Sequence, residues 1–153
     1  MRAQIGEQCV INANAQFWDK MLAMTLEPMA GRREFHVSAG HLLGSVDLSG
    51  VWTGRIEVRL DGELARQATA AMMMQPAESV AEADTVDATK EIANIIAGVI
   101  KSCLPRPCAM TVPEAAVEAR DFTSEAAGED TIEVVFRHEA GDLMVRVWER
   151  ECL

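Results

Sequence analysis

The sequence lacks any run of the roughly 20 apolar residues that a membrane-spanning helix requires. It also lacks the long apolar core of a secretory signal peptide, since Glu7 interrupts the first residues. Clusters of Lys and Arg are missing too, because 24 acidic residues face 14 basic ones and the formal net charge is −10. Such a balance repels nucleic-acid phosphates and anionic membrane surfaces. We therefore expect a cytoplasmic protein that binds neither nucleic acid nor membrane.

Cysteine pairs with a metal-binding or redox spacing are also absent. The chain has four cysteines: Cys9, Cys103, Cys108 and Cys152. The segment Leu-Pro-Arg-Pro separates the second from the third, which is not a Cys-x-x-Cys motif, and no second pair completes a tetrahedral zinc site. In a chain without an export signal, we expect these residues to be free, buried thiols rather than disulfides.

What the sequence does contain is typical of one compact domain over residues 1–153. The chain is 49% hydrophobic and 25% charged, which suits a globular fold with a core of its own. Apolar residues at three- and four-residue spacing predict helices over 6–26, 63–74 and 84–104. We expect Pro28 and Pro105 to end the first and third helices, and Met72 and Met73 to fill the core beneath the second.

Alternating apolar and polar residues predict strands between and after these helices. The segments are 42–48, 51–60, 131–137 and 143–148, with a shorter candidate over 108–112. Gly50 and the segment 139–142 read as turns, and short turns join antiparallel neighbours. The predicted fold class is α/β (α+β), with a mainly antiparallel sheet that long helices cover on one face.

The third helix confines its polar residues to a single stripe. At 100° per residue, the stripe collects Asp84, Asp87, Lys90, Glu91, Asn94, Gly98, Lys101 and Ser102, while the rest of the helix surface is apolar or small. Glu91 and Asn94 lie three residues apart, so their side chains occupy neighbouring turns of one face. A glycine inside a helix costs about 1 kcal/mol relative to alanine, which suggests that another backbone approaches Gly98. Spacing alone supports a docking surface.

A longer string around these residues resembles a known family. The segment Asp87-Ala-Thr-Lys-Glu91-Ile-Ala-Asn94-Ile-Ile-Ala-Gly98 is similar to the signature helix of the CheC/CheX/FliY family of bacterial chemotaxis phosphatases. Met110-Thr-Val-Pro113 resembles the later segment that carries the family's proline. The strand at 51–58 and the helix after it also look like the stretch that precedes the signature. A single signature in a chain of this length is most similar to the CheX branch.

The resemblance implies a CheC-like fold and dephosphorylation of a phosphorylated, CheY-like response regulator. Asn94 would orient the attacking water, and Glu91 would hold the active-site lysine of the regulator. Asp87, Gly98 and Lys101 would belong to the partner-binding surface. The regulator would bring its own aspartyl phosphate and Mg²⁺, so the chain would need no cofactor or metal of its own. Family members of this kind also form homodimers through the sheet.

Two other functions fit the same residues. The chain could be a non-catalytic signalling module that binds a response regulator or another partner through this helix. It could also be a small-molecule sensor, which a large internal cavity would favour. A divalent-metal site on Asp84, Asp87 and Glu91 is disfavoured because no histidine accompanies them at helical spacing. The dispersed histidines His36, His41 and His138 are expected to be structural or on the surface.

Overall fold

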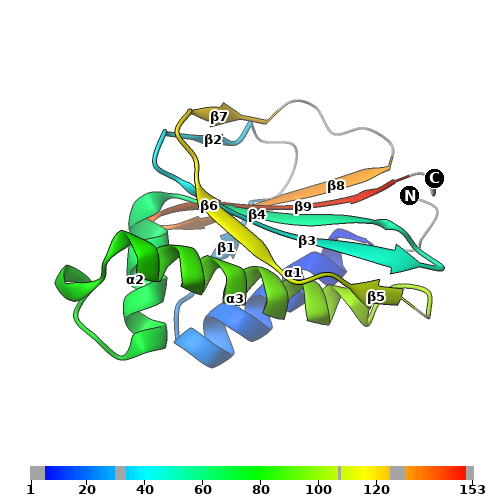
Figure 1. The fold of residues 1–153 in the computed structure, drawn as a ribbon, viewed down its shortest axis with the longest axis horizontal. Coiled ribbons are helices and arrows are strands. Elements are labelled where there is room, and N and C mark those ends of the chain that lie inside the picture. Colours follow the sequence, from blue (N-terminus) through cyan, green and yellow to red (C-terminus); the bar gives the residue numbers. More distant parts are fainter. Residues whose placement is uncertain (1–5, 30–33, 107, 125–129, 151–153) are drawn as a thin grey trace.

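An antiparallel sheet with helices on one face organises the chain (Figure 1). The computed structural model describes residues 6–29, 34–106, 108–124 and 130–150. In chain order the elements are α1 (Glu7–Ala15), the π-helix η1 (Gln16–Met21), β1 (Glu27–Pro28), β2 (His36–Val37), β3 (Leu42–Gly50), β4 (Gly54–Leu60), α2 (Gly62–Met73), the 3-10 turn η2 (Ala77–Ser79), α3 (Glu82–Lys101), β5 (Cys108–Met110), β6 (Glu114–Val117), β7 (Phe122–Thr123), β8 (Thr131–His138) and β9 (Gly141–Glu149).

Two hairpins form the centre of the sheet. β3 pairs with β4 and β8 pairs with β9, while β4 and β9 join the hairpins, so the strand order is β1-β8-β9-β4-β3-β5, with β6 also on β3. All of these pairings are antiparallel. The predicted fold class is therefore confirmed, and both hairpins form as the alternating pattern predicted. The second strand of the first hairpin begins at Gly54 and not at residue 51, because residues 51–53 form the turn after β3.

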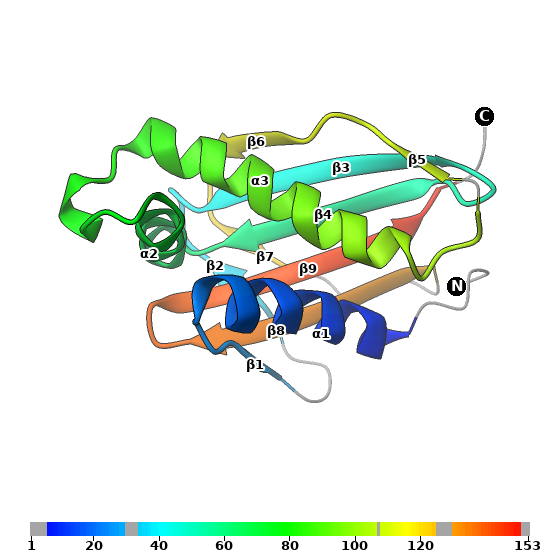
Figure 2. The same ribbon diagram turned by 90° about the horizontal axis from the view of Figure 1, so that it is seen from below.

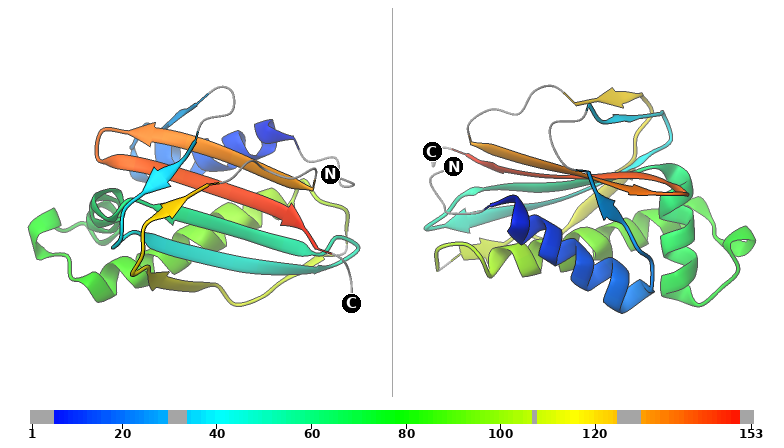
Figure 3. Two further views of the ribbon diagram at one scale, coloured as in Figure 1. Left: turned by 90° about the horizontal axis from the view of Figure 1, so that it is seen from above. Right: turned by 180° about the vertical axis from the view of Figure 1, so that it is seen from behind.

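The helices gather on one face of this sheet. Figure 2 shows α1 and α3 lying across the strands, with α2 seen end-on beside them. Among the described residues, none on the opposite face is helical, and there the ribbon of β2 and β7 lies over part of the sheet (Figure 3). Phe35, Val37 and Met144 form a small second core beneath this ribbon. Within the described residues, no helix is long and apolar enough to span a membrane.

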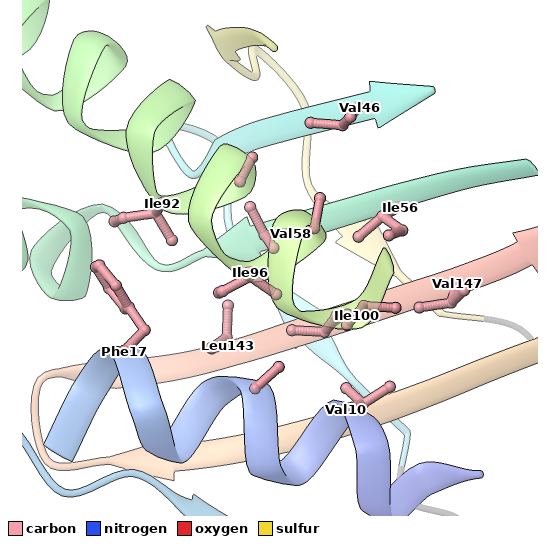
Figure 4. Packing of buried hydrophobic residues seen from close by; sticks show 14 of the residues in the cluster. Val10, Phe17, Val46, Ile56, Val58, Ile92, Ile96, Ile100, Leu143 and Val147 are labelled. Atoms are coloured by element: carbon pink, nitrogen blue, oxygen red, sulfur yellow. The ribbon is translucent and has the colours of Figure 1, made fainter. Parts of the chain in front are cut away.

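The main core lies between the helices and the sheet. Ile92, Ile96 and Ile100 of α3 are fully buried, and they pack towards Ile56, Val58 and Val147 of the strands (Figure 4). Burying each such side chain contributes about 1.5–3 kcal/mol. The three isoleucines are four residues apart, so they form one stripe along α3 and fix which side of the helix faces solvent.

The first helix is shorter than predicted. Residues 22–26 were expected to be helical, but the helical turns end at Met21, where the Met24 N–H donates to the Trp18 carbonyl (2.8 Å) and Ala23 adopts a positive φ of 53°. The chain then turns to pair Glu27 and Pro28 with the open edge of β8. This edge strand forms hydrogen bonds with backbone groups of β8. The spacing of apolar residues along the chain does not report such a need, so the sequence pattern predicted helix instead.

The prediction that all four cysteines are free thiols is partly wrong. Cys9 and Cys103 form a disulfide, because α1 and α3 pack side by side and bring their Cα atoms to 6.9 Å. Cys108 is a free, buried thiol as expected, and Cys152 lies outside the described residues. Met73 also departs from its predicted core position, since it is 40% exposed near the end of α2.

Candidate functional site

Helix α3 lies unusually close to β3, and Gly44 makes this possible. A Cβ atom at Gly44 would stand 3.0 Å from Thr89 Cγ2 and 3.1 Å from both Ala93 Cβ and the Thr89 carbonyl oxygen. Thr89 and Ala93 lie two residues before and after Glu91, which is about 200° around the helix in either direction. Pressing them against β3 therefore turns Glu91 away from the sheet. The spacing of apolar residues did not point to Gly44 as the site of this close contact, although a glycine inside a strand often marks close backbone approach.

The outer side of α3 carries the polar stripe that the 100° spacing of residues predicted. Asp87, Glu91 and Gly98 are exposed, and Asn94 and Lys101 are partly buried. The opposite side of the helix holds Ile92 and Ile96, which are fully buried. The structure thus brings all five predicted site residues onto one exposed ridge along the helix, although their individual roles remain predictions.

Glu91 and Asn94 have no polar partner in the part of the chain that the structure describes. Neither side chain enters a hydrogen bond or an ion pair there, whereas Glu63 on α2 binds Arg66 at 2.7 Å. An exposed Glu and a half-buried Asn without partners keep their hydrogen-bonding capacity for another molecule. Asn offers both a donor and an acceptor and does not titrate, so this pair can bind a cation and orient a water at neighbouring points.

Gly98 extends this surface towards the C-terminal end of α3. A Cβ atom built at Gly98 meets nothing within 4 Å in the described structure. Packing within the chain therefore does not require a glycine here, and the space outside it is open. A flat helix surface of this kind lets a partner approach the backbone closely.

The N-terminal turn of α3 explains Asp84 structurally. Its Oδ2 atom accepts a hydrogen bond from the Ala81 N–H at 3.1 Å, and the helix begins at Glu82, two residues before the predicted start at residue 84. Asp84 thus stabilises the helix start. Across the described residues, no three potential metal ligands converge.

The histidines occupy three separate environments. Nδ1 of the buried His41 lies 2.9 Å from the Ser38 carbonyl oxygen, and its Nε2 atom lies 2.9 Å from Arg59 Nη1. Arginine is always a donor, so Nε2 accepts and His41 is the neutral Nδ1–H tautomer. His36 bonds to Thr123 Oγ1, and His138 accepts from the Ala140 N–H. Each therefore has a local structural contact, as the sequence predicted.

Three carboxyl groups on the sheet have shifted pKa values. The hydrogen bond from Arg55 lowers the pKa of Asp47, while burial raises the pKa of Glu57 and of Glu133. Asp47 pairs with Arg55 across β3 and β4, and Arg146 of β9 lies between Glu57 of β4 and Glu133 of β8. They stabilise strand pairing and do not touch the stripe on α3.

A groove of about 860 Å³ lies at the end of the molecule near α2. The turn after η1, the last turns of α2 and the tip of the β8–β9 hairpin line it, with Met24, Gln67 and His138 among the lining residues. None of the stripe residues on α3 contributes to it. The candidate site is therefore an exposed helix surface outside this groove, which suits a macromolecular partner better than a small ligand.

Comparison with known families gives one match. The family described as chemotaxis phosphatase CheX matches residues 42–137, a stretch that contains the whole of α3 and both halves of the β3–β4 hairpin. No curated protein sequence matches the chain.

Solved structures share the fold at low sequence identity. The chemotaxis protein CheX of Vibrio vulnificus is 17% identical, with a TM-score of 0.74 over 94% of this chain and 95% of that one. CheX of Desulfovibrio desulfuricans is 17% identical, with a TM-score of 0.73 over 94% and 97%. CheX of Borrelia burgdorferi, in a complex with CheY, BeF3 and Mg²⁺, is 19% identical, with a TM-score of 0.69 over 95% and 97%.

Proposed function

Because the chain belongs to the CheX family of chemotaxis phosphatases, we propose that it hydrolyses the aspartyl phosphate of a CheY-like response regulator. The observation that carries the proposal is the exposed ridge of α3, on which Glu91 and Asn94 keep free polar groups. The Borrelia relative in complex with CheY supports the choice of partner.

In this proposal the two side chains have different tasks. Glu91 forms a salt bridge with a lysine of the regulator and fixes how the two proteins dock. Asn94 accepts a hydrogen bond from a water and holds it in line with the phosphorus. The water oxygen bonds to phosphorus, the bond from phosphorus to the aspartyl oxygen breaks, and inorganic phosphate leaves with a proton going to solvent. Positioning and electrostatics dominate phosphoryl transfer, so an amide that cannot titrate suffices.

The rest of the stripe would form the surrounding contact. Gly98 allows close approach, Lys101 contacts the regulator at the far end of α3, and Asp87 supports the acidic half of the ridge. Mg²⁺ would arrive with the regulator, and the chain itself would use no cofactor. We also propose that the protein works in the cytoplasm as a homodimer, which light scattering on a size-exclusion column would test.

Loss of the water-orienting amide is the direct test of catalysis. We expect Asn94→Ala to slow phosphate release from a phosphorylated regulator by on the order of 10²-fold or more, while binding persists. Asn12→Ala, which removes an exposed amide from α1, is the matched control and should keep the wild-type rate. Equal rates for Asn94→Ala and wild type would exclude the catalytic role of Asn94.

Charge reversal tests the docking role. Glu91→Lys should weaken binding to the regulator in titration calorimetry, since two lysines would then face each other. Glu139→Lys makes the same change in net charge on the exposed β8–β9 turn and should bind normally. Unchanged affinity for Glu91→Lys would remove the proposed grip. If the wild type binds the phosphorylated regulator without hydrolysing it, the chain is the non-catalytic module instead.

A further inference from the structure

The disulfide ties the site helix to the first helix of the chain. Cys9 lies in the first turn of α1, and Cys103 lies two residues beyond the end of α3. They are 94 residues apart in sequence, yet Figure 2 shows the start of α1 and the end of α3 on the same side of the molecule. The bond therefore closes a loop that contains β1, β3 and β4 of the main sheet together with α2 and α3.

Solvent can reach one side of this disulfide. Cys103 is exposed and Cys9 is partly buried. Cys108 differs from both, since it is buried, donates from Sγ to the Trp52 carbonyl (3.4 Å) and has a pKa raised mainly by burial. Reducing thiols can thus approach Cys103, whereas Cys108 is protected and keeps little thiolate.

Within the described residues, few other interactions hold the first turn of α1. Its N-cap residue is Gly6, which offers no side-chain cap, and the Cys9 N–H donates to the Gly6 carbonyl at 3.1 Å. Burial on the sheet side begins at Val10 and continues at Ala13. The end of α3 is better held, because Ile100 and Leu104 are buried on either side of Cys103.

We propose that the Cys9–Cys103 disulfide is a redox-sensitive tether that low-molecular-weight thiols open reversibly. A thiolate attacks the Cys103 sulfur, the bond between the two protein sulfurs breaks, and Cys9 leaves and takes up a proton. A second thiol then attacks the mixed disulfide and releases Cys103 as a thiol. Two reductant thiols become one disulfide, and the protein disulfide becomes two thiols.

Opening the tether loosens the ends of the two helices and leaves their middle unchanged. The freed segments are the first turn of α1 and the turn after α3, because the sheet side of both helices stays packed in the core. Lys101 lies two residues before Cys103, whereas Asn94 lies nine residues before it. If the proposed function holds, reduction therefore changes the affinity for the regulator and leaves the hydrolysis step at Asn94 intact.

Hydrogen exchange on oxidised and reduced protein tests the tether. The experiment uses the full chain with Cys152→Ser, so that Cys9, Cys103 and Cys108 are the remaining cysteines. On reduction with dithiothreitol we expect faster exchange in residues 7–12 and 99–104, unchanged exchange in 89–96, and a melting temperature lower by about 4–16 °C. Adding Cys9→Ser and Cys103→Ser should give the reduced behaviour under both conditions. Adding Cys108→Ser should preserve the response.

The outcomes separate the tether from the phosphatase proposal. Three free thiols after oxidation with glutathione disulfide, or identical exchange in the oxidised and reduced forms, would refute the tether. These measurements need no regulator, so they stand if Asn94→Ala shows no loss of hydrolysis. With active enzyme, a KM for the phosphorylated regulator that rises at least twofold on reduction with an unchanged kcat supports the link to the site. An unchanged KM confines the tether to stability and overturns that link.

Discussion

Replacing Gly44 by alanine should weaken the packing of α3, the helix that carries the candidate site, against β3. The added Cβ atom would stand 3.0–3.1 Å from Thr89 Cγ2, Ala93 Cβ and the Thr89 carbonyl oxygen. Two of these three atoms cannot rotate away, because one belongs to the helix backbone and the other is attached directly to it. The helix or the strand must therefore move by a few tenths of an ångström.

The expected loss follows from two opposing effects. Overpacking a close-packed core costs about 1–3 kcal/mol. Replacing a glycine whose φ is not positive gains about 0.4–1 kcal/mol through the unfolded chain. At the middle of both ranges, the net loss in the free energy of unfolding is about 1.3 kcal/mol, or a melting temperature lower by roughly 3–5 °C for a chain of this size.

Gly98→Ala provides the matched control on α3 itself. A Cβ atom there meets nothing within 4 Å, so alanine should raise the free energy of unfolding by about 1 kcal/mol through helix propensity. Urea denaturation of both variants, with unchanged m-values, measures the difference. Thr89→Ser should recover part of the loss in Gly44→Ala by removing Cγ2. If Gly44→Ala proves as stable as wild type, α3 does not pack against β3 as closely as the structure shows.

Two further predictions concern stability and pH. Burial raises the pKa of Glu57 above its ordinary value of 4.5, so the contribution of this group to the free energy of unfolding is favourable below pH 4.5 and is lost as pH rises through the folded-state pKa. In urea denaturation, Glu57→Gln should therefore be more stable than wild type at pH 7 and should show no such gain below pH 4.5. A loss of stability at pH 7 would contradict this. Gly54→Ala should destabilise by about 3 kcal/mol or prevent folding, because its Cβ would run into the Trp52 ring and the Trp148 carbonyl; a wild-type melting curve would refute that packing.

The ridge on α3 also explains why the site does not coincide with a pocket. Under the proposed function, the chain completes the active site of a partner, so its side chains must point outward and the partner provides the concave part. The groove near α2 contains none of the stripe residues. That groove therefore lies away from Glu91 and Asn94.

Local patterns were sufficient where one periodicity decides burial. The alternation in β3, β4, β8 and β9 placed both hairpins, because successive strand residues face opposite sides of the sheet. The spacing of Ile92, Ile96 and Ile100 placed the stripe of α3 on the outside, because these residues must be buried on the other side. The proposed roles of Glu91 and Asn94 come from the family likeness, because periodicity cannot distinguish them.

The sequence by itself therefore determined the fold class, the exposed face of α3 and the residues that belong to it. Tertiary structure decided how closely α3 approaches β3 at Gly44, where α1 gives way to an edge strand, and that Cys9 meets Cys103. The physical reason is the distance along the chain over which each interaction acts. Periodicity reports which side of an element is buried over a few residues, whereas these three features depend on atoms that only the packing of distant segments brings together.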